Sequence, residues 1–156
     1  MKLYRFSPIK SEINLFKAID YILDQSQKLA IKVIDVNLPF SGKITVCTHY
    51  FEEYTALQPI LHRIGTFDLH HNGDRVILTK PIMTLHGTIT HVRLREPDPY
   101  RFQVGAGDFK VDDYVAFKTK YLRPDNPYLR EIIRPDLTML EFWHPDFDVA
   151  AYIVKK

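Results

Sequence analysis

The chain of 156 residues has one cysteine, little net charge and no long apolar run, and each of these scarcities argues against a class of protein. Cys47 cannot form an internal disulfide, so we expect a reducing compartment and a thiol that packs in the core. A net charge of +2 at pH 7 is too small to indicate a nucleic-acid or acidic membrane partner. No apolar run approaches the ~18 residues of a membrane span, and the N-terminus lacks the apolar stretch of a signal peptide. The sequence therefore predicts a cytoplasmic protein that binds neither membrane nor nucleic acid.

What is present is typical of a folded α+β protein. Hydrophobic residues make up 46% of the chain, and the aromatic share of 13% is high, which suits a strand-rich core. The length is sufficient for one domain with a full hydrophobic core. We expect a single domain over residues 1–156.

Apolar residues at three- and four-residue spacing predict two helices in the first half of the chain. The first runs from Ser11, which caps it, to Ala30, and the second covers FEEYTALQPILHRIG, residues 51–65. Gly65 is placed to stop the second helix, and Pro59 inside it predicts a kink or a break. A third helical stretch covers DDYVAFKTKYL, and a last short helix is expected to start near Asp146.

Short β-branched and alternating runs predict strands between these helices. They are GKITVC, the runs on either side of the turn residues His71 to Asp74, IMTLHGTITHVRLRE, GDFKV, REIIR and LTMLEF. Gly105 and Gly107 are not a phosphate-binding loop, because the sequence VGAGD leads into a strand and lacks the downstream Lys-Ser/Thr.

Two segments of the chain are alike, which indicates an internal duplication. Residues 52–57, EEYTAL, and residues 112–117, DDYVAF, match in kind at every position: acid, acid, Tyr, β-branched, Ala, large apolar. A strand of the form Gly-x-apolar-x-Val precedes each copy, and extended runs follow each. The sequence thus predicts two strand-helix-strands modules, one over about 41–100 and one over about 101–156, after an N-terminal helical segment over about 1–40.

A pair of βαβββ modules is the hallmark of the vicinal oxygen chelate superfamily, which includes glyoxalase I and the bleomycin-resistance proteins. Within it the chain most resembles the YecM family, through the order of its segments along most of its length. These are the N-terminal helix, the strand before FEEYTAL, HRIG, KPI, VRLRE with its Pro-rich turn, GDFKV, NPY and LEFWHP. The resemblance implies an α+β fold in which two βαβββ modules pack into one domain behind an N-terminal helix.

The resemblance also implies where a site would lie. In that superfamily a divalent metal, held by His and Glu side chains of the strands, sits in a cleft between the modules and chelates two substrate oxygens. The first-strand His falls on Lys43, or on Thr45 if the register slips by two, and its counterpart in the second module falls on Asp108. The Glu before the Pro-rich turn falls on Arg93. Only Asp108 can bind a metal, so we expect no metal and no cofactor, with the usual ligand positions replaced.

Basic side chains alternate along ITHVRLRE, so His91, Arg93 and Arg95 share one face of a strand. One interpretation is a solvated outer face of a half-buried sheet. The other is that this face lines the cleft, where Lys43 and Arg93 would supply fixed positive charge for a small anion.

Other candidates have weaker support from the sequence. Arg75 can reach the cleft or be solvated. Glu141 and His144, near Trp143, resemble a polar pair of the last strand, in which Glu141 can act on a ligand or form a surface ion pair. His70 and His71 are explained better by a tight turn than by metal binding.

Two functions stay open at this point. The first is a small-molecule enzyme or ligand-binding protein of the vicinal oxygen chelate type, metal-free and acting on a small anion. Its candidate ligand-binding residues are Lys43, Arg75, His91, Arg93, Asp108 and Glu141. The second is a non-catalytic scaffold or protein-interaction descendant of the fold. The relatives occur both as single-chain pairs and as dimers, so a homodimer also stays open.

Overall fold

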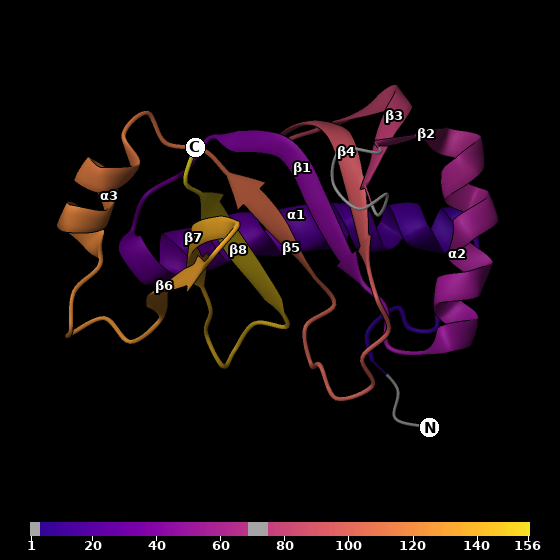
Figure 1. Cartoon of the computed structure of the whole chain (residues 1–156). Helices are drawn as coiled ribbons and strands as arrows, with labels where there is room; N and C mark the ends of the chain where they lie inside the picture. The colour runs from indigo at the N-terminus through magenta and orange to yellow at the C-terminus, as the bar shows by residue number, and fades with distance from the viewer. Residues whose placement is uncertain (1–3, 69–74) are drawn as a thin grey trace.

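The structure, a computed structural model, describes residues 4–68 and 75–156. Within these residues the chain forms three helices and eight strands (Figure 1). In chain order they are α1 (Glu12–Ile34), β1 (Phe40–Cys47), α2 (Phe51–Ile64), β2 (Gly65–Asp68), β3 (Arg75–Thr84), β4 (Gly87–Arg95), β5 (Gly105–Phe109), α3 (Tyr114–Tyr121), β6 (Leu129–Arg134), β7 (Leu137–Phe142) and β8 (Val149–Val154).

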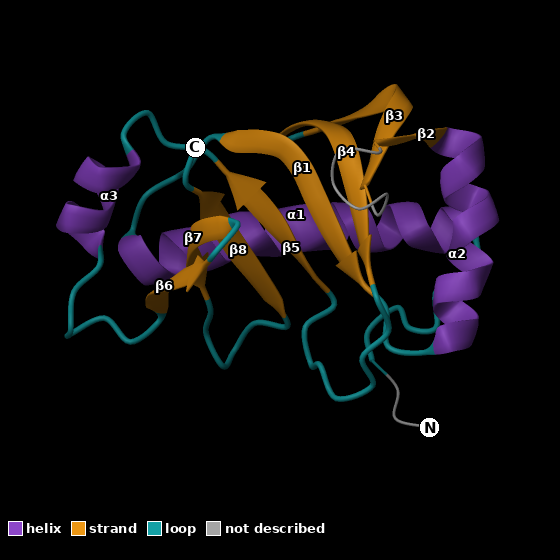
Figure 2. Cartoon of the chain, in the orientation of Figure 1, coloured by secondary structure: helices purple, strands orange, loops and turns teal. Residues whose placement is uncertain are grey.

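All eight strands form one mixed sheet in the order β2-β3-β4-β1-β5-β8-β7-β6. The halves of this order have matching connectivity: β1 is parallel to β4 and β5 is parallel to β8, while the remaining pairs within each half are antiparallel. An antiparallel pairing of β1 with β5 joins the halves. The predicted fold class is therefore confirmed: two βαβββ modules, β1 to β4 with α2 and β5 to β8 with α3, follow an N-terminal helix. Figure 2 shows α2 and α3 at opposite ends of the sheet.

Helix α1 packs across the centre of the sheet and covers one of its faces. Ser11 caps its first turn by accepting a hydrogen bond from the backbone N–H of Asn14, as predicted. Its apolar side includes Leu15, Ile19 and Ile22, which are buried completely or nearly so and belong to the main hydrophobic core. The helix runs behind β1, β5 and β8 in Figure 1 and contacts all three.

The glycines of β5 allow this close packing. A Cβ atom on Gly105 would lie 2.4 Å from Cδ1 of Ile22 and 2.4 Å from the carbonyl oxygen of Thr45, distances that no real contact tolerates. Two residues on, the backbone N–H of Gly107 donates to the hydroxyl of Ser26 on α1 (3.0 Å). Gly105 and Gly107 thus serve helix-sheet packing, in agreement with the prediction that they are not a phosphate loop.

Two details of the predicted elements are wrong, and one prediction is narrowed. Of the kink or break predicted at Pro59, the break does not occur, because helix α2 runs through that residue. Thr55, whose carbonyl oxygen has no helical N–H partner because residue 59 is proline, is exposed, so water can hydrate it. The short helix predicted to start near Asp146 is not formed, and the chain enters strand β8 there. β8 is a mostly buried apolar run whose length fits either a strand or a short helix. Strand β5 is shifted by two residues: it runs from Gly105 to Phe109, whereas the predicted strand GDFKV covers residues 107–111.

The turn predicted at His71 to Asp74, and His70 with it, lie outside the described residues. No helix in the described part of the chain is long and apolar enough to cross a membrane.

Candidate functional site

A cleft of about 730 Å³ lies where the two modules meet, on the face of the sheet that α1 does not cover. The strand register shows which side chains face it. Ile44 and Val46 pair with Gly107 and Gly105, which face α1. Because side chains alternate along a strand, Lys43 and Thr45 must point to the other face, and both line the cleft.

The half of the cleft that module one forms is strongly basic. Among the described residues, the charged side chains that line this half are all cations: Lys43 on β1, Arg75 on β3, and Arg93 and Arg95 on β4. Arg75 is the register partner of Arg93, and Arg93 is the partner of Thr45, so these side chains form a row across three strands. All four of these cations are half-buried.

The half that module two forms is mixed in character. It has three carboxylates, Asp108, Asp112 and Asp136, and three cations, Lys110, Arg134 and Lys156. Apolar side chains from β7 and β8 also line it, with Tyr152 beside Asp108 in the strand register. Its charges balance, and the net positive charge of the cleft comes from module one.

An irregularity in β1 positions the two residues at the join. The register of β1 against β5 shifts between Phe40 and Ile44, and Gly42 there has a φ of 95°, a left-handed conformation that favours glycine. The hydroxyl of Ser41 donates to the backbone carbonyl of Asp108 (2.7 Å), which ties the irregular segment to β5. Lys43 and Asp108, equivalent positions of the two modules, consequently lie near each other at the cleft floor.

The charges at the cleft floor influence one another's pKa values. Burial raises the pKa of Asp108 to about 6, although Arg75, Lys43 and Arg93 all act to lower it. Burial, and then the nearby charge of Arg75, lower the pKa of Lys43, while Asp108 opposes that shift. Within residues 4–68 and 75–156, no side chain forms a hydrogen bond or a close ion pair with the Asp108 carboxylate. This carboxylate therefore faces the cleft among cations without direct contact.

The structure brings together four of the six candidate residues: Lys43, Arg75, Arg93 and Asp108. His91 is the register partner of Lys43, but it is not among the residues that line the cleft, and its Nδ1 lies 2.8 Å from the hydroxyl of Thr90.

Glu141 also lies outside the cleft lining. It is buried on β7, where the guanidinium of Arg130 donates to it from Nε at 2.7 Å. Tyr152 is its register partner on β8, and burial, together with the charge of Glu141, raises the pKa of that tyrosine. The proposed ion pair of Glu141 therefore exists, but its carboxylate is buried and does not line the cleft.

Most of the residues that line the cleft were not among the six, and Arg95 and Tyr152 are two of them. Arg95 follows Arg93 at strand spacing, so the alternation in VRLRE could have identified it. Tyr152 lies just after Asp146, where a short helix was predicted to start. Because the segment was not identified as a strand, Tyr152 was not recognised as a residue that faces the cleft.

The donor chemistry at the join does not fit a divalent metal. Of the positions where the resemblance places metal ligands, Lys43 and Arg93 carry cationic groups without a lone pair to donate, and Asp108 supplies one carboxylate. In the part of the chain that the structure describes, no group of three or more His, Cys, Asp or Glu residues is arranged to hold a metal ion.

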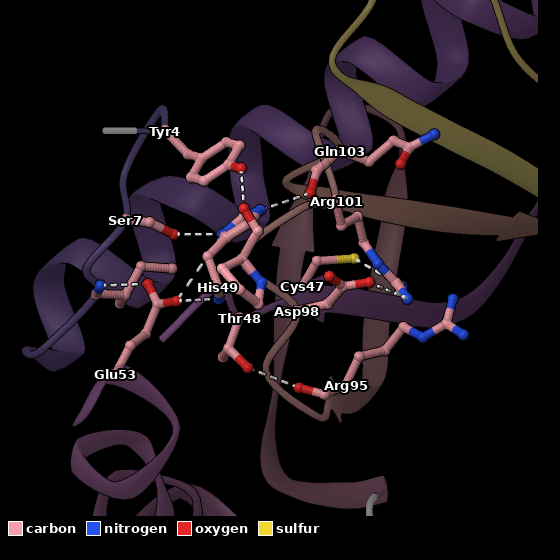
Figure 3. Close-up of polar contacts among 12 residues, drawn as sticks. Tyr4, Ser7, Cys47, Thr48, His49, Glu53, Arg95, Asp98, Arg101 and Gln103 are labelled. Carbon is pink, nitrogen blue, oxygen red and sulfur yellow. Dashed lines mark hydrogen bonds and ion pairs between the residues drawn. The ribbon is translucent and has the colours of Figure 1, made fainter. Parts of the chain in front are cut away.

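A second polar cluster surrounds His49, just beyond the end of β1 (Figure 3). His49 is buried, stacks on the ring of Tyr4 at 3.8 Å between centroids, and has Nε2 3.1 Å from the carbonyl oxygen of Gln103. Since a carbonyl only accepts, Nε2 carries the proton, and Nδ1 accepts from the hydroxyl of Ser7 (2.8 Å). Burial lowers the pKa of His49, in keeping with this neutral form.

Ser7, His49 and Glu53 do not form a catalytic triad. Ser7 and Glu53 both lie on the Nδ1 side of the ring, Glu53 at 3.9 Å, whereas a triad needs them on opposite nitrogens. Glu53 instead accepts two backbone N–H groups, from Ile9 (2.6 Å) and His49 (2.8 Å). The cluster therefore fastens the N-terminal segment and the β4–β5 loop to module one.

Comparison with protein-family models, with curated proteins and with solved structures gave no match for this chain.

Proposed function

We propose that the protein binds a small organic anion in the cleft between its modules, as an enzyme or ligand-binding protein of the vicinal oxygen chelate type. The observation that carries this proposal is the basic half of the cleft, where four cations converge and where, among the described residues, no carboxylate lines the same half. Guanidinium groups bind carboxylates and phosphates through paired hydrogen bonds, which gives geometry as well as affinity. The volume of about 730 Å³ lies in the range of ordinary small-molecule sites.

The family resemblance supports the same site. It places ligand-binding positions at Lys43, Arg93 and Asp108, and these residues lie together at the join of the modules. In this proposal Lys43 and Arg93 replace a metal by fixed positive charge, so neither a metal nor another cofactor takes part. A cytoplasmic location and the absence of a nucleic-acid partner remain predictions of the sequence.

The second candidate function is a protein-interaction scaffold with no chemistry in the cleft. The observation that favours it is the exposed apolar tip of the β3–β4 hairpin, where Met83 and Leu85 have most or all of their surface in solvent. In this case the surface that matters is the hairpin, and cations of the cleft are only solvated charges.

Calorimetric titration with malonate, succinate and sugar phosphates at low ionic strength tests the proposal. We expect at least one of these anions to bind, and Arg93→Met to weaken binding by about tenfold or more, since a charged hydrogen-bonded contact is lost. The matched control is Lys17→Met, which removes a charge from an exposed position on α1, on the opposite side of the sheet.

Absence of binding for the whole panel would overturn the proposal, as would equal losses from Arg93→Met and Lys17→Met. The circular dichroism spectrum of each variant separates loss of a contact from loss of the fold.

A further inference from the structure

The two halves of the cleft differ in chemistry, and this difference restricts the ligand further. The inference rests on the proposed function, because it concerns the anion bound in that cleft. In the described part of module one, the polar side chains that line the cleft are its four cations and the hydroxyls of Ser41 and Thr45. The nearby carboxylate of Asp68, on β2 beside Arg75, leaves this half positive. Several cations around one small volume suit a group with two negative charges, such as a phosphate monoester.

The half from module two has an apolar wall. Leu137 and Met139 of β7 and Val154 of β8 line it, and Met139 is the register partner of Val154. These three side chains come from adjacent strands, and in the strand order β5 with Asp108 separates them from the strands that carry Arg75, Arg93 and Lys43. Such an apolar wall stabilises the apolar part of a ligand by removing it from water.

An aromatic ring extends this wall. The hydroxyl of Tyr114 donates to Oε2 of Glu131 (2.9 Å), and that carboxylate is held by Lys118 at 2.8 Å. Glu131 does not line the cleft, so the ring of Tyr114 is the part that adds to the apolar wall. Tyr152, which also lines this half, lies on β8 beside Glu141 in the strand register.

We propose that the ligand is an amphiphilic phosphate monoester whose phosphate group binds to Lys43, Arg75 and Arg93 and whose apolar body lies against Leu137, Met139 and Val154. Asp108 lies between the two regions, at the floor of the cleft. A carboxylate there repels a second acidic group, so the body of the ligand is neutral where it passes Asp108.

Titration calorimetry with two probes that share one head group tests this inference. Methyl phosphate and phenyl phosphate are both phosphate monoesters, and only the second has a body large enough to reach the apolar wall. We expect phenyl phosphate to bind about tenfold more tightly or better, from the apolar surface that it buries. Phenol, which has the body without the charge, should not bind at the same concentrations.

Two variants test the apolar half and the basic half of the cleft separately. The double substitution Leu137→Asn with Val154→Thr should reduce the affinity for phenyl phosphate toward that for methyl phosphate and leave methyl phosphate unchanged. Arg93→Met should weaken both probes alike. A series of alkyl phosphates on the unmodified protein gives the same information without a variant, since affinity should rise with chain length.

The outcomes separate this inference from the proposed function. Equal affinity for methyl and phenyl phosphate, with both weakened by Arg93→Met, would overturn the amphiphilic ligand and leave anion binding in place. Binding of malonate or succinate without either phosphate would overturn the inference in the same way. No binding by any anion would overturn both.

Discussion

Asp108 lies among three cations, and the pKa of its carboxyl group is nevertheless raised above the ordinary value. Burial on the cleft floor outweighs the charges of Arg75, Lys43 and Arg93, and raises the pKa to about 6. In the folded protein the group therefore holds its proton over a pH range in which the unfolded chain has already lost it. The free energy of unfolding consequently falls as the pH rises from about 4 to about 6 on account of this group, and stays reduced above that range.

Replacing Asp108 with Asn should therefore stabilise the protein at about pH 8 and have little effect at about pH 4. The expected gain at the higher pH is on the order of 1 kcal/mol, because solvent reaches a half-buried carboxyl and reduces the full effect of its shift. Urea unfolding of both proteins at the two pH values measures it. Asp136→Asn is the control, since it removes the same charge from an exposed position at the cleft rim. A gain that is equal at both pH values would contradict this account of Asp108.

Single residues also show how far a sequence can locate a site. Lys43 and Asp108 were identified as equivalent positions of the two modules and Arg93 through the family resemblance, and all three lie in one cleft. His49 was missed because its partners, Ser7 and Gln103, lie 42 and 54 residues away in the chain. No local pattern records such contacts; they arise only when the N-terminal segment and the β4–β5 loop fold against β1.

Among the elements, α2 depends on the N-terminal segment as much as on its own sequence. Its first turn contains two adjacent acids with opposite environments: Glu52 is exposed, whereas the side chain of Glu53 is completely buried. Glu53 accepts backbone N–H groups from Ile9 and His49, so it joins α2 to the segment before α1 and to the end of β1.

Glu53→Ala should lower the free energy of unfolding by about 3 kcal/mol, because it leaves two buried backbone N–H groups without an acceptor. Glu52→Ala is the matched control, at the adjacent position in the same helical turn, and should change stability by less than about 0.5 kcal/mol. Urea unfolding provides the comparison, and limited proteolysis of the N-terminal segment shows whether that segment detaches first. Similar losses for the two variants would mean that the buried contacts do not stabilise the protein as described.

The elements themselves were predicted unevenly, for a physical reason. α1 has a long apolar period and a capping serine, so both its type and its start were predicted. β8 has six residues, all apolar except for Tyr152, and it pairs with β5 on one side and β7 on the other. Because both faces of such an interior strand can be apolar, the sequence lacks the polar-apolar alternation that identifies a strand. The start of a helix was therefore expected where the chain instead enters a central strand.

For the whole molecule, the pairing of β1 with β5 makes one continuous sheet from two similar modules. α1 then packs across β1 and β5, on both sides of the join, and also across β8. The duplication predicted the modules, but strand order and direction depend on long-range pairing that the local sequence does not specify. The cleft follows from that pairing, since it exists only where Lys43 and Asp108 are brought to adjacent strands.

Such a joined sheet should unfold in a single transition. Trp143, the one tryptophan of the chain, lies in module two, and its indole N–H donates to the carbonyl of Pro127 (3.0 Å). Its fluorescence therefore reports on module two, while far-ultraviolet circular dichroism reports largely on α1 and α2. We expect the two signals to give the same urea midpoint, as two-state unfolding requires. A fluorescence change that precedes the loss of helix would divide the chain into separate domains and contradict the single-domain prediction.

The sheet is open, and this has a consequence for the behaviour of the protein at high concentration. Its outer strands, β2 and β6, each leave one row of backbone groups unpaired by the sheet, where a strand of another chain could add and start aggregation. β2 has only four residues. β6 carries Arg130, Glu131 and Arg134, and Pro135 follows it. The shortness of β2, and the charges of β6 with the proline that follows it, disfavour the addition of a strand from another chain. The features that end the sheet therefore also help to keep neighbouring molecules apart.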